Sequence, residues 1–90
     1  MSETNLRIGV LGCGMISGNH FEAWQRVHGA SVVAVCDPDA GRARQRAQEF
    51  GIAAIYTDPA QMLEREQLDA VDIITPRQTH ADMVLLAAEH

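Results

Sequence analysis

Gly12-Cys13-Gly14-Met15-Ile16-Ser17 directly follows an apolar run and directly precedes a helical pattern. The spacing is the G-x-G-x-x-small arrangement of a strand–turn–helix unit that binds a dinucleotide. Gly12 permits the tight turn, and Gly14 has no side chain, so that a diphosphate can approach the backbone. We expect the N–H groups near Met15 and Ile16 to face this anion at the positive end of the helix.

Outward from this loop, apolar runs alternate with helical patterns. Four runs predict strands without polar alternation, which indicates burial on both faces of a parallel sheet: Leu6–Leu11, Ser31–Cys36, Ala54–Tyr56 and Ala70–Thr75. Helices are predicted between and after them: Ile16 to about Val27, Ala40–Phe50, a helix capped by Asp58 with Pro59 at its first position, and one that starts near Thr79. Right-handed crossovers then give an α/β fold, the first part of a doubly wound parallel Rossmann sheet with strand order 3-2-1-4.

Three of these helices have a predicted inner face, and in the last helix, near Thr79, it consists of Ala81, Val84, Leu85 and Ala88. In the first helix the inner residues follow one another at three-residue steps: Phe21, Trp24 and Val27. In the second they are Ala40, Ala43, Ala47 and Phe50, and Gly51 follows as the stop signal. The last helical pattern reaches His90 with no fifth strand after it. We therefore expect residues 1–90 to be a partial dinucleotide-binding domain, truncated before strand five, with the substrate domain absent from this chain.

Composition excludes several classes of partner. The net charge is −5, and all seven basic residues are arginines, which argues against nucleic acid and anionic membranes as partners. No apolar run is long enough for a membrane helix, and the first residues do not form a secretory signal. A cytoplasmic location is expected. Whether the protein forms a homo-oligomer is left open.

The two cysteines, Cys13 and Cys36, are too few for a disulfide scaffold. Grouped with His20 and His80 they match no metal-binding spacing, so no metal site is predicted. Because both cysteines are placed at the ends of adjacent strands, a redox switch between them is a minor alternative.

Asp37 follows the second predicted strand, 25 residues after Gly12. In a dinucleotide-binding fold, an acid at this place accepts hydrogen bonds from the adenosine ribose hydroxyls. Standing before Pro38, Asp37 also fits the N-cap of the next helix, and the two roles are compatible. A 2′-phosphate beside its carboxylate would be repelled by about 1–4 kcal/mol, which favours NAD over NADP. Three arginines could offset this repulsion, but they are expected to form a solvated helix face: Arg42, Arg44 and Arg46.

The segment from Asp69 to His80, with Asp-Ala-Val-Asp-Ile-Ile-Thr-Pro followed by a histidine, makes the prediction more specific. It resembles the N-terminal domain of the Gfo/Idh/MocA family (glucose–fructose oxidoreductase, inositol dehydrogenase, rhizopine catabolism), and the resemblance runs from about Leu6 to His90. It implies an oxidoreductase that transfers a hydride between a nicotinamide and a hydroxyl-bearing carbon of a sugar or cyclitol. It also implies that Thr75, Pro76 and His80 line the nicotinamide-side ribose and pyrophosphate, whereas His20 is taken as structural.

Members of this family continue with a Gly-Lys-x-Val-x-x-Glu-Lys-Pro stretch, and this chain has no lysine at all. We therefore assign no catalytic residue here: the full-length parent is expected to be an enzyme, and these 90 residues alone to be inactive. Two alternatives remain open. One is a non-catalytic nucleotide-sensing or interaction module, and the other is the same portion of an amino-acid-type dehydrogenase.

Overall fold

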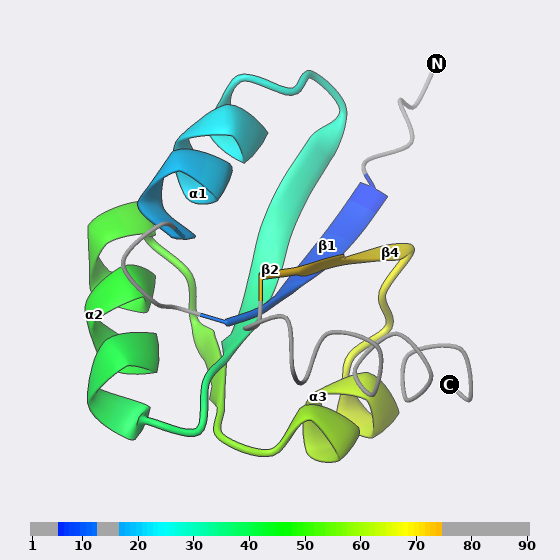
Figure 1. Ribbon diagram of the computed structural model, residues 1–90. Helices are drawn as coiled ribbons and strands as arrows, with labels where there is room; N and C mark the ends of the chain where they lie inside the picture. Colours follow the sequence, from blue (N-terminus) through cyan, green and yellow to red (C-terminus); the bar gives the residue numbers. More distant parts are fainter. Residues whose placement is uncertain (1–5, 13–16, 75–90) are drawn as a thin grey trace.

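The computed structural model describes residues 6–12 and 17–74, and the account below concerns that part of the chain. Its strands form one parallel sheet in the order β3-β2-β1-β4, as predicted (Figure 1). The strands are β1 (Leu6–Leu11), β2 (Ala30–Cys36), β3 (Ala54–Tyr56) and β4 (Ala70–Ile73). The helices are α1 (Ser17–Gln25), α2 (Ala40–Phe50) and α3 (Pro59–Arg65).

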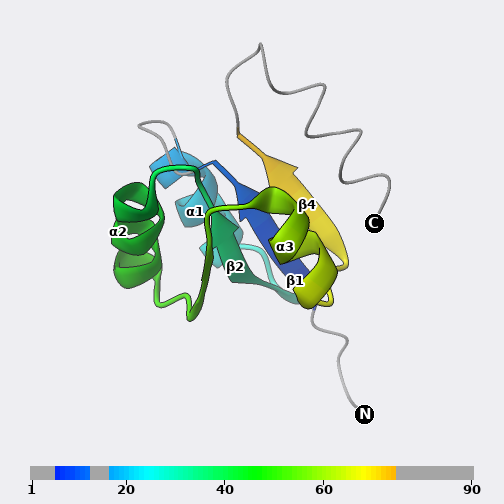
Figure 2. The ribbon, with the colours of Figure 1, turned by 90° about the horizontal axis from the view of Figure 1, so that it is seen from below.

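The helices cover the two faces of the sheet unequally (Figure 2). On one face, α1 and α2 bury a core that includes Val10, Phe21 and Ala47. On the other face, α3 packs Met62 against Leu11 and its neighbours. The helices that connect β1, β2 and β3 therefore lie on one face, and α3, which connects β3 to β4, lies on the other. The boundary between β1 and β4 is thus the topological switch point, where sheets of this kind bind ligands.

Residues at the helix ends satisfy the backbone groups that a helix leaves unpaired. The Asp39 carboxylate caps α2 by accepting hydrogen bonds from the N–H groups of Gly41 and Arg42 at 2.9 and 3.3 Å. The alternative role of Asp37 as the N-cap is therefore wrong, because the helix starts two residues later than that role requires. Gly51 ends α2 in the left-handed region with φ 69°, as predicted.

Two of the residues predicted for inner helix faces lie outside the core. Helix α1 ends at Gln25, and the N–H groups of Arg26 and Val27 donate to carbonyls three residues earlier. This tightening of the last turn directs Val27 into solvent, where 44% of it is exposed. Ala40 is also exposed, because it occupies the first turn of α2 at the edge of the sheet.

The interior of the α1–α2 face is completed by an aromatic pair. The rings of Phe21 in α1 and Phe50 in α2 stack with their centroids 5.1 Å apart and an interplanar angle of 14°. Aromatic pairs of this kind add to the stabilisation that comes from buried area. The pair therefore ties the middle of α1 to the C-terminal end of α2.

Within the described residues, no helix has both the length and the apolar character needed to span a bilayer. The helix predicted to start near Thr79, and the last predicted residue of the fourth strand, Thr75, lie outside the described residues.

Candidate functional site

The carboxyl ends of the strands are aligned at one edge of the sheet. Hydrogen bonds continue the ladder past the strand ends, from Gly12 N–H to the Cys36 carbonyl and from Ile74 N–H to the Leu11 carbonyl, each at 2.7 Å. The N–H of Asp37 likewise donates to the Tyr56 carbonyl at 3.1 Å. Because Leu11 and Cys36 are partners in the ladder, Gly12 and Asp37 are neighbours on adjacent strands, which lie about 5 Å apart in a sheet.

The turn after β1 has the backbone conformation that only glycine tolerates. Gly12 has φ 108°, far outside the range open to residues with a side chain. This conformation fits the predicted tight turn at the end of β1. The other predicted residues of the loop, Gly14, Met15 and Ile16, lie outside the described residues.

Helix α1 begins at Ser17, five residues after Gly12, and approaches α2 closely in its first turn. A Cβ atom placed on Gly18 would lie 3.5 Å from Nη1 of Arg46. The Arg46 side chain is only 18% exposed and also meets the Glu49 carboxylate at 3.1 Å. Arg46 therefore packs between the two helices, whereas the sequence predicted a solvated position.

Asp37 is buried, with 6% of the residue exposed. Its Oδ1 atom accepts a hydrogen bond from the backbone N–H of Asp39 at 2.8 Å, which closes a turn of the Asx type. This bond holds the carboxylate at the carboxyl edge, beside the turn at Gly12. The exposed Arg42, one of the predicted counter-charges, faces the Asp39 carboxylate at 3.8 Å.

Cys36 precedes Asp37 and is buried on the α3 face. Burial first, and then the negative charges of Asp37 and Asp58, raise the pKa of its thiol from 9.0 to about 12. The thiolate is the reactive form, so Cys36 is a poor nucleophile and a poor redox partner. Cys13, the other half of the alternative redox switch, lies outside the described residues.

A polar cluster of His20, Trp24 and Asp72 joins α1 to β4, and the sequence reasoning did not anticipate it. The Oδ2 atom of Asp72 lies 3.0 Å from His20 Nδ1 and accepts a hydrogen bond from Trp24 Nε1 at 2.9 Å. The sequence signal that could have revealed the cluster is Asp72 itself, an acid inside an otherwise apolar strand. A half-buried carboxylate in a strand requires donors, and α1 supplies two of them from positions one turn apart.

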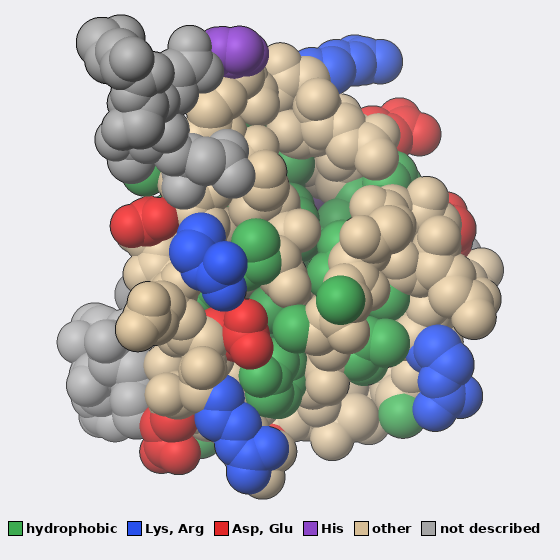
Figure 3. Space-filling view, turned by 180° about the vertical axis from the view of Figure 1, so that it is seen from behind, with side chains coloured by type: hydrophobic (Ala, Val, Ile, Leu, Met, Phe, Trp, Pro, Cys, Tyr) green, Lys and Arg blue, Asp and Glu red, His purple; other side chains and the backbone are tan. Residues whose placement is uncertain are grey.

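The remaining predicted site residues, Thr75, Pro76 and His80, lie outside the described residues. In the described part of the chain, no group of three or more His, Cys, Asp or Glu side chains could hold a metal ion. The basic and acidic side chains on the face shown in Figure 3 are scattered around a band of hydrophobic ones.

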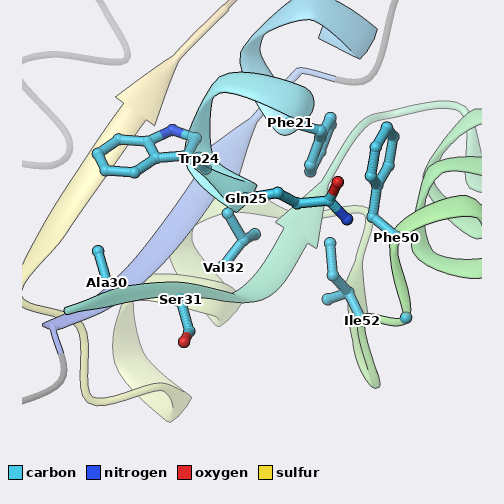
Figure 4. Close-up of a pocket in the computed structure, with 9 residues that line it drawn as sticks. Phe21, Trp24, Gln25, Ala30, Ser31, Val32, Phe50 and Ile52 are labelled. Carbon is cyan, nitrogen blue, oxygen red and sulfur yellow. The ribbon is translucent and has the colours of Figure 1, made fainter. Parts of the chain in front are cut away.

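A hollow among the described residues lies away from the carboxyl edge. It has a volume of about 490 Å³ and lies beneath the Phe21–Phe50 pair, where the first residues of β2, such as Ser31, and Ile52 form its walls (Figure 4). This place is the amino end of β2. Because Gly12 and Asp37 lie at the opposite, carboxyl edge of the sheet, this hollow is not the predicted diphosphate site.

A parallel sheet with a glycine turn after its first strand and an acid at the end of the neighbouring strand defines a dinucleotide-binding domain of the Rossmann class. Comparison with known families agrees. Residues 6–90 match the model of the Gfo/Idh/MocA family, described as an oxidoreductase family with an NAD-binding Rossmann fold. The chain belongs to this family.

Among similar curated proteins, D-apiose dehydrogenase of Paraburkholderia graminis is 49% identical over 80 residues, covering 89% of this chain and 21% of that protein. An scyllo-inositol 2-dehydrogenase (NAD(+)) of Bacillus subtilis is 44% identical over 89 residues, covering 98% of this chain and 26% of that protein. The chain thus spans about a quarter of the length of these relatives.

A solved structure extends the likeness to three dimensions. An oxidoreductase from Agrobacterium radiobacter, crystallised with NAD+, L-tartaric acid and magnesium, superimposes with a TM-score of 0.93 at 38% identity. The match covers 97% of this chain and 25% of that one. The predicted strand order and fold class are therefore confirmed both within the chain and by comparison.

Proposed function

We propose that this chain is the NAD-binding part of a longer oxidoreductase that transfers a hydride to or from a sugar, a cyclitol or a related hydroxyl compound. The observation that carries the proposal is the adjacency of Gly12 and Asp37 at the carboxyl edge of the sheet. Gly12 makes the tight turn that begins the diphosphate loop, and Asp37 offers a carboxylate to a ribose. Bound NAD supplies the nicotinamide that exchanges the hydride.

In this proposal the residues of the chain bind and orient the cofactor without taking part in bond making. Gly12, Gly14, Met15 and Ile16 form the backbone cradle for the diphosphate, at the start of α1. Asp37 accepts hydrogen bonds from the adenosine ribose. Three further residues border the nicotinamide side: Thr75, Pro76 and His80. Their place follows from the family resemblance and from their position after β4, beside β1.

The choice of NAD over NADP rests on charge. In this proposal the buried Asp37 carboxylate lies within a few ångströms of the 2′ position of the adenosine ribose, and a 2′-phosphate there would be repelled by the like charge. Of the three nearby arginines, Arg42 faces Asp39 and Arg46 meets Glu49, so both already have acidic neighbours. These pairs support NAD as the cofactor.

The class of substrate is proposed from the relatives, whose names refer to apiose and inositol rather than to an amino acid. The same comparison favours an enzyme over a sensing module. A cytoplasmic location is proposed because two cysteines are too few for the disulfide scaffold that is typical of small secreted domains. Nucleic acid and membranes are not proposed as partners.

The test is an assay of the longer protein encoded by the same gene. Purified protein is supplied with NAD+ or NADP+ and a panel of inositols, apiose and other sugars, with amino acids as the contrasting class, and NADH or NADPH formation is followed by absorbance. We expect turnover of a cyclitol or sugar with NAD+, and none by the 90-residue chain alone. Turnover of amino acids only, or a preference for NADP+, would overturn the proposal.

A further inference from the structure

We propose that His20, Trp24 and Asp72 form a positioning cluster that sets the first turn of α1 against β4 and thereby shapes the diphosphate site. This inference rests on the proposed function, because it concerns residues that do not touch the cofactor. It goes beyond that function by assigning a role in cofactor affinity to Asp72, a residue inside the sheet.

The cluster is built around one carboxylate oxygen. Asp72 Oδ2 lies 3.0 Å from His20 Nδ1 and 2.9 Å from Trp24 Nε1, so two side chains of α1 converge on a single atom of β4. The Asp72 side chain is 20% exposed and that of His20 is 42% exposed. Hydrogen bonds to an ionised acceptor are stronger than neutral ones, and partial burial strengthens them further.

The position of the cluster in the fold gives these bonds a specific consequence. Helix α1 connects β1 to β2, whereas β4 lies on the other side of β1, across the switch point. The bonds to Asp72 therefore tie the helix across the place where the two halves of the fold separate. On its opposite side, the helix is held to α2 by the stacking of Phe21 on Phe50. Without Asp72, α1 would lose its hydrogen bonds to β4 and keep only its packing on the sheet and on α2, about which it could tilt.

The cluster also lies close to the proposed cofactor edge. His20 is three residues after Ser17, the start of α1, a distance of about 4.5 Å along the helix axis. Asp72 is the ladder partner of Val10, two residues before Gly12. A shift of the helix at His20 would therefore move the N–H groups at the start of α1 relative to the glycine turn. Binding groups that must act together lose much of their effect when they are displaced by about 1 Å.

The test compares variants of Asp72 in the 90-residue chain, with NAD+ affinity read by NMR titration, which is suited to weak binding. Asp72→Leu removes the acceptor, whereas Asp72→Asn keeps an oxygen that can accept both bonds but removes the charge. We expect the dissociation constant for NAD+ to rise about five- to thirtyfold in the Leu variant and only about two- to threefold in the Asn variant, which keeps weaker, neutral hydrogen bonds.

A simple charge effect predicts another pattern. If Asp72 acted only by repelling the diphosphate, both variants would bind NAD+ more tightly, and that result would overturn the inference. The matched charge control is Glu22→Gln, on the exposed side of the same helix, which should leave affinity unchanged. The stability control is Gly51→Ala, at the far end of α2, which should lower the melting temperature without changing affinity.

Trp24 provides a second readout, because it is the sole tryptophan of the chain. Loss of the carboxylate beside its indole should shift the fluorescence emission of the Asp72→Leu variant even without NAD+. If that variant fails to fold, His20→Leu and its donor-keeping counterpart His20→Asn repeat the affinity comparison. Unchanged NAD+ affinity in the Leu variants would overturn the inference alone. If the unaltered chain does not bind NAD+, the same variants are compared in the longer protein. Absence of NAD+ binding by the longer protein too would contradict the proposed function, and the inference with it.

Discussion

The Oδ1 atom of Asp37 accepts a hydrogen bond from the backbone N–H of Asp39 at 2.8 Å, and the carboxylate of Asp39 in turn caps α2. The two acids on either side of Pro38 thus have different roles at the end of β2. Asp39 stabilises the helix, and Asp37 stays at the carboxyl edge beside Gly12. The cofactor role proposed for the first carboxylate is therefore not shared by the second, which belongs to the cap of α2.

The first prediction follows from this difference in roles. Asp37→Ala should relax the preference for NAD+ over NADP+ by about tenfold or more, because the repulsion of a 2′-phosphate is removed. The measurement is the ratio of the two dissociation constants. Asp39→Ser is the control, since it removes a nearby charge but keeps a good N-cap residue, and the ratio should not change. An equal ratio in the Asp37 variant and the parent would leave Asp37 without a role in cofactor choice.

The second prediction concerns the end of α2. Gly51→Ala should lower the free energy of unfolding by about 1 kcal/mol, because φ 69° is strained for a residue with a Cβ atom although nothing lies within 4 Å of that atom. Gly51→Asn should cost less, since asparagine tolerates the left-handed region. Urea unfolding measures both. Equal losses for Ala and Asn would point to a cause other than backbone strain.

The third prediction concerns Gly9, at the register shift of β1 against β2. A Cβ atom here would lie 2.6 Å from Cδ1 of Leu68 and 3.1 Å from Cε of Met62, so Gly9→Ala overpacks the α3 face. We expect a loss of about 1–3 kcal/mol in the free energy of unfolding. Because the closest contact is with the tip of Leu68, adding Leu68→Ala should cost less in the Gly9→Ala background than in the parent. Strict additivity of the two losses would contradict this packing.

The fourth prediction concerns the thiol of Cys36, studied in a Cys13→Ser chain so that one thiol remains. Its pKa is raised from 9.0 to about 12 in the folded chain, so the unfolded chain releases the proton first as the pH rises. The free energy of unfolding should therefore decrease between pH 9 and about 12, and the thiol should resist labelling at pH 8 until the chain unfolds. Rapid labelling of the folded chain at pH 8 would contradict the burial of Cys36.

Much of this fold could be predicted because local signals and burial pattern agree. The apolar runs gave all four strands to within one or two residues, and Gly51, Asp58 and Pro59 marked helix ends correctly. Errors arose where the spacing of apolar residues continued past the end of the regular helix. Val27 keeps the three-residue spacing of α1, but the tightened last turn directs it outward.

The particular contacts of polar side chains were harder to predict than the strands and helices. Asp39 and Asp37 are both suited to an N-cap, and only the start of α2 decides between them. Arg46 has the sequence character of a surface residue, yet the small Gly18 of α1 leaves room for it between the helices. The link from Asp72 to His20 joins residues 52 apart in sequence, and no local pattern specifies such a contact.

The most direct test of the central claim is an amide NMR titration of the chain with NAD+. The account predicts that the backbone signals of Gly12 and Asp37 shift together along one binding curve, whereas Ser31 and Gly51, which line the hollow at the amino end of β2, stay in place. Shifts confined to Ser31 and Gly51, or no shifts at Gly12 and Asp37 at saturating NAD+, would contradict it.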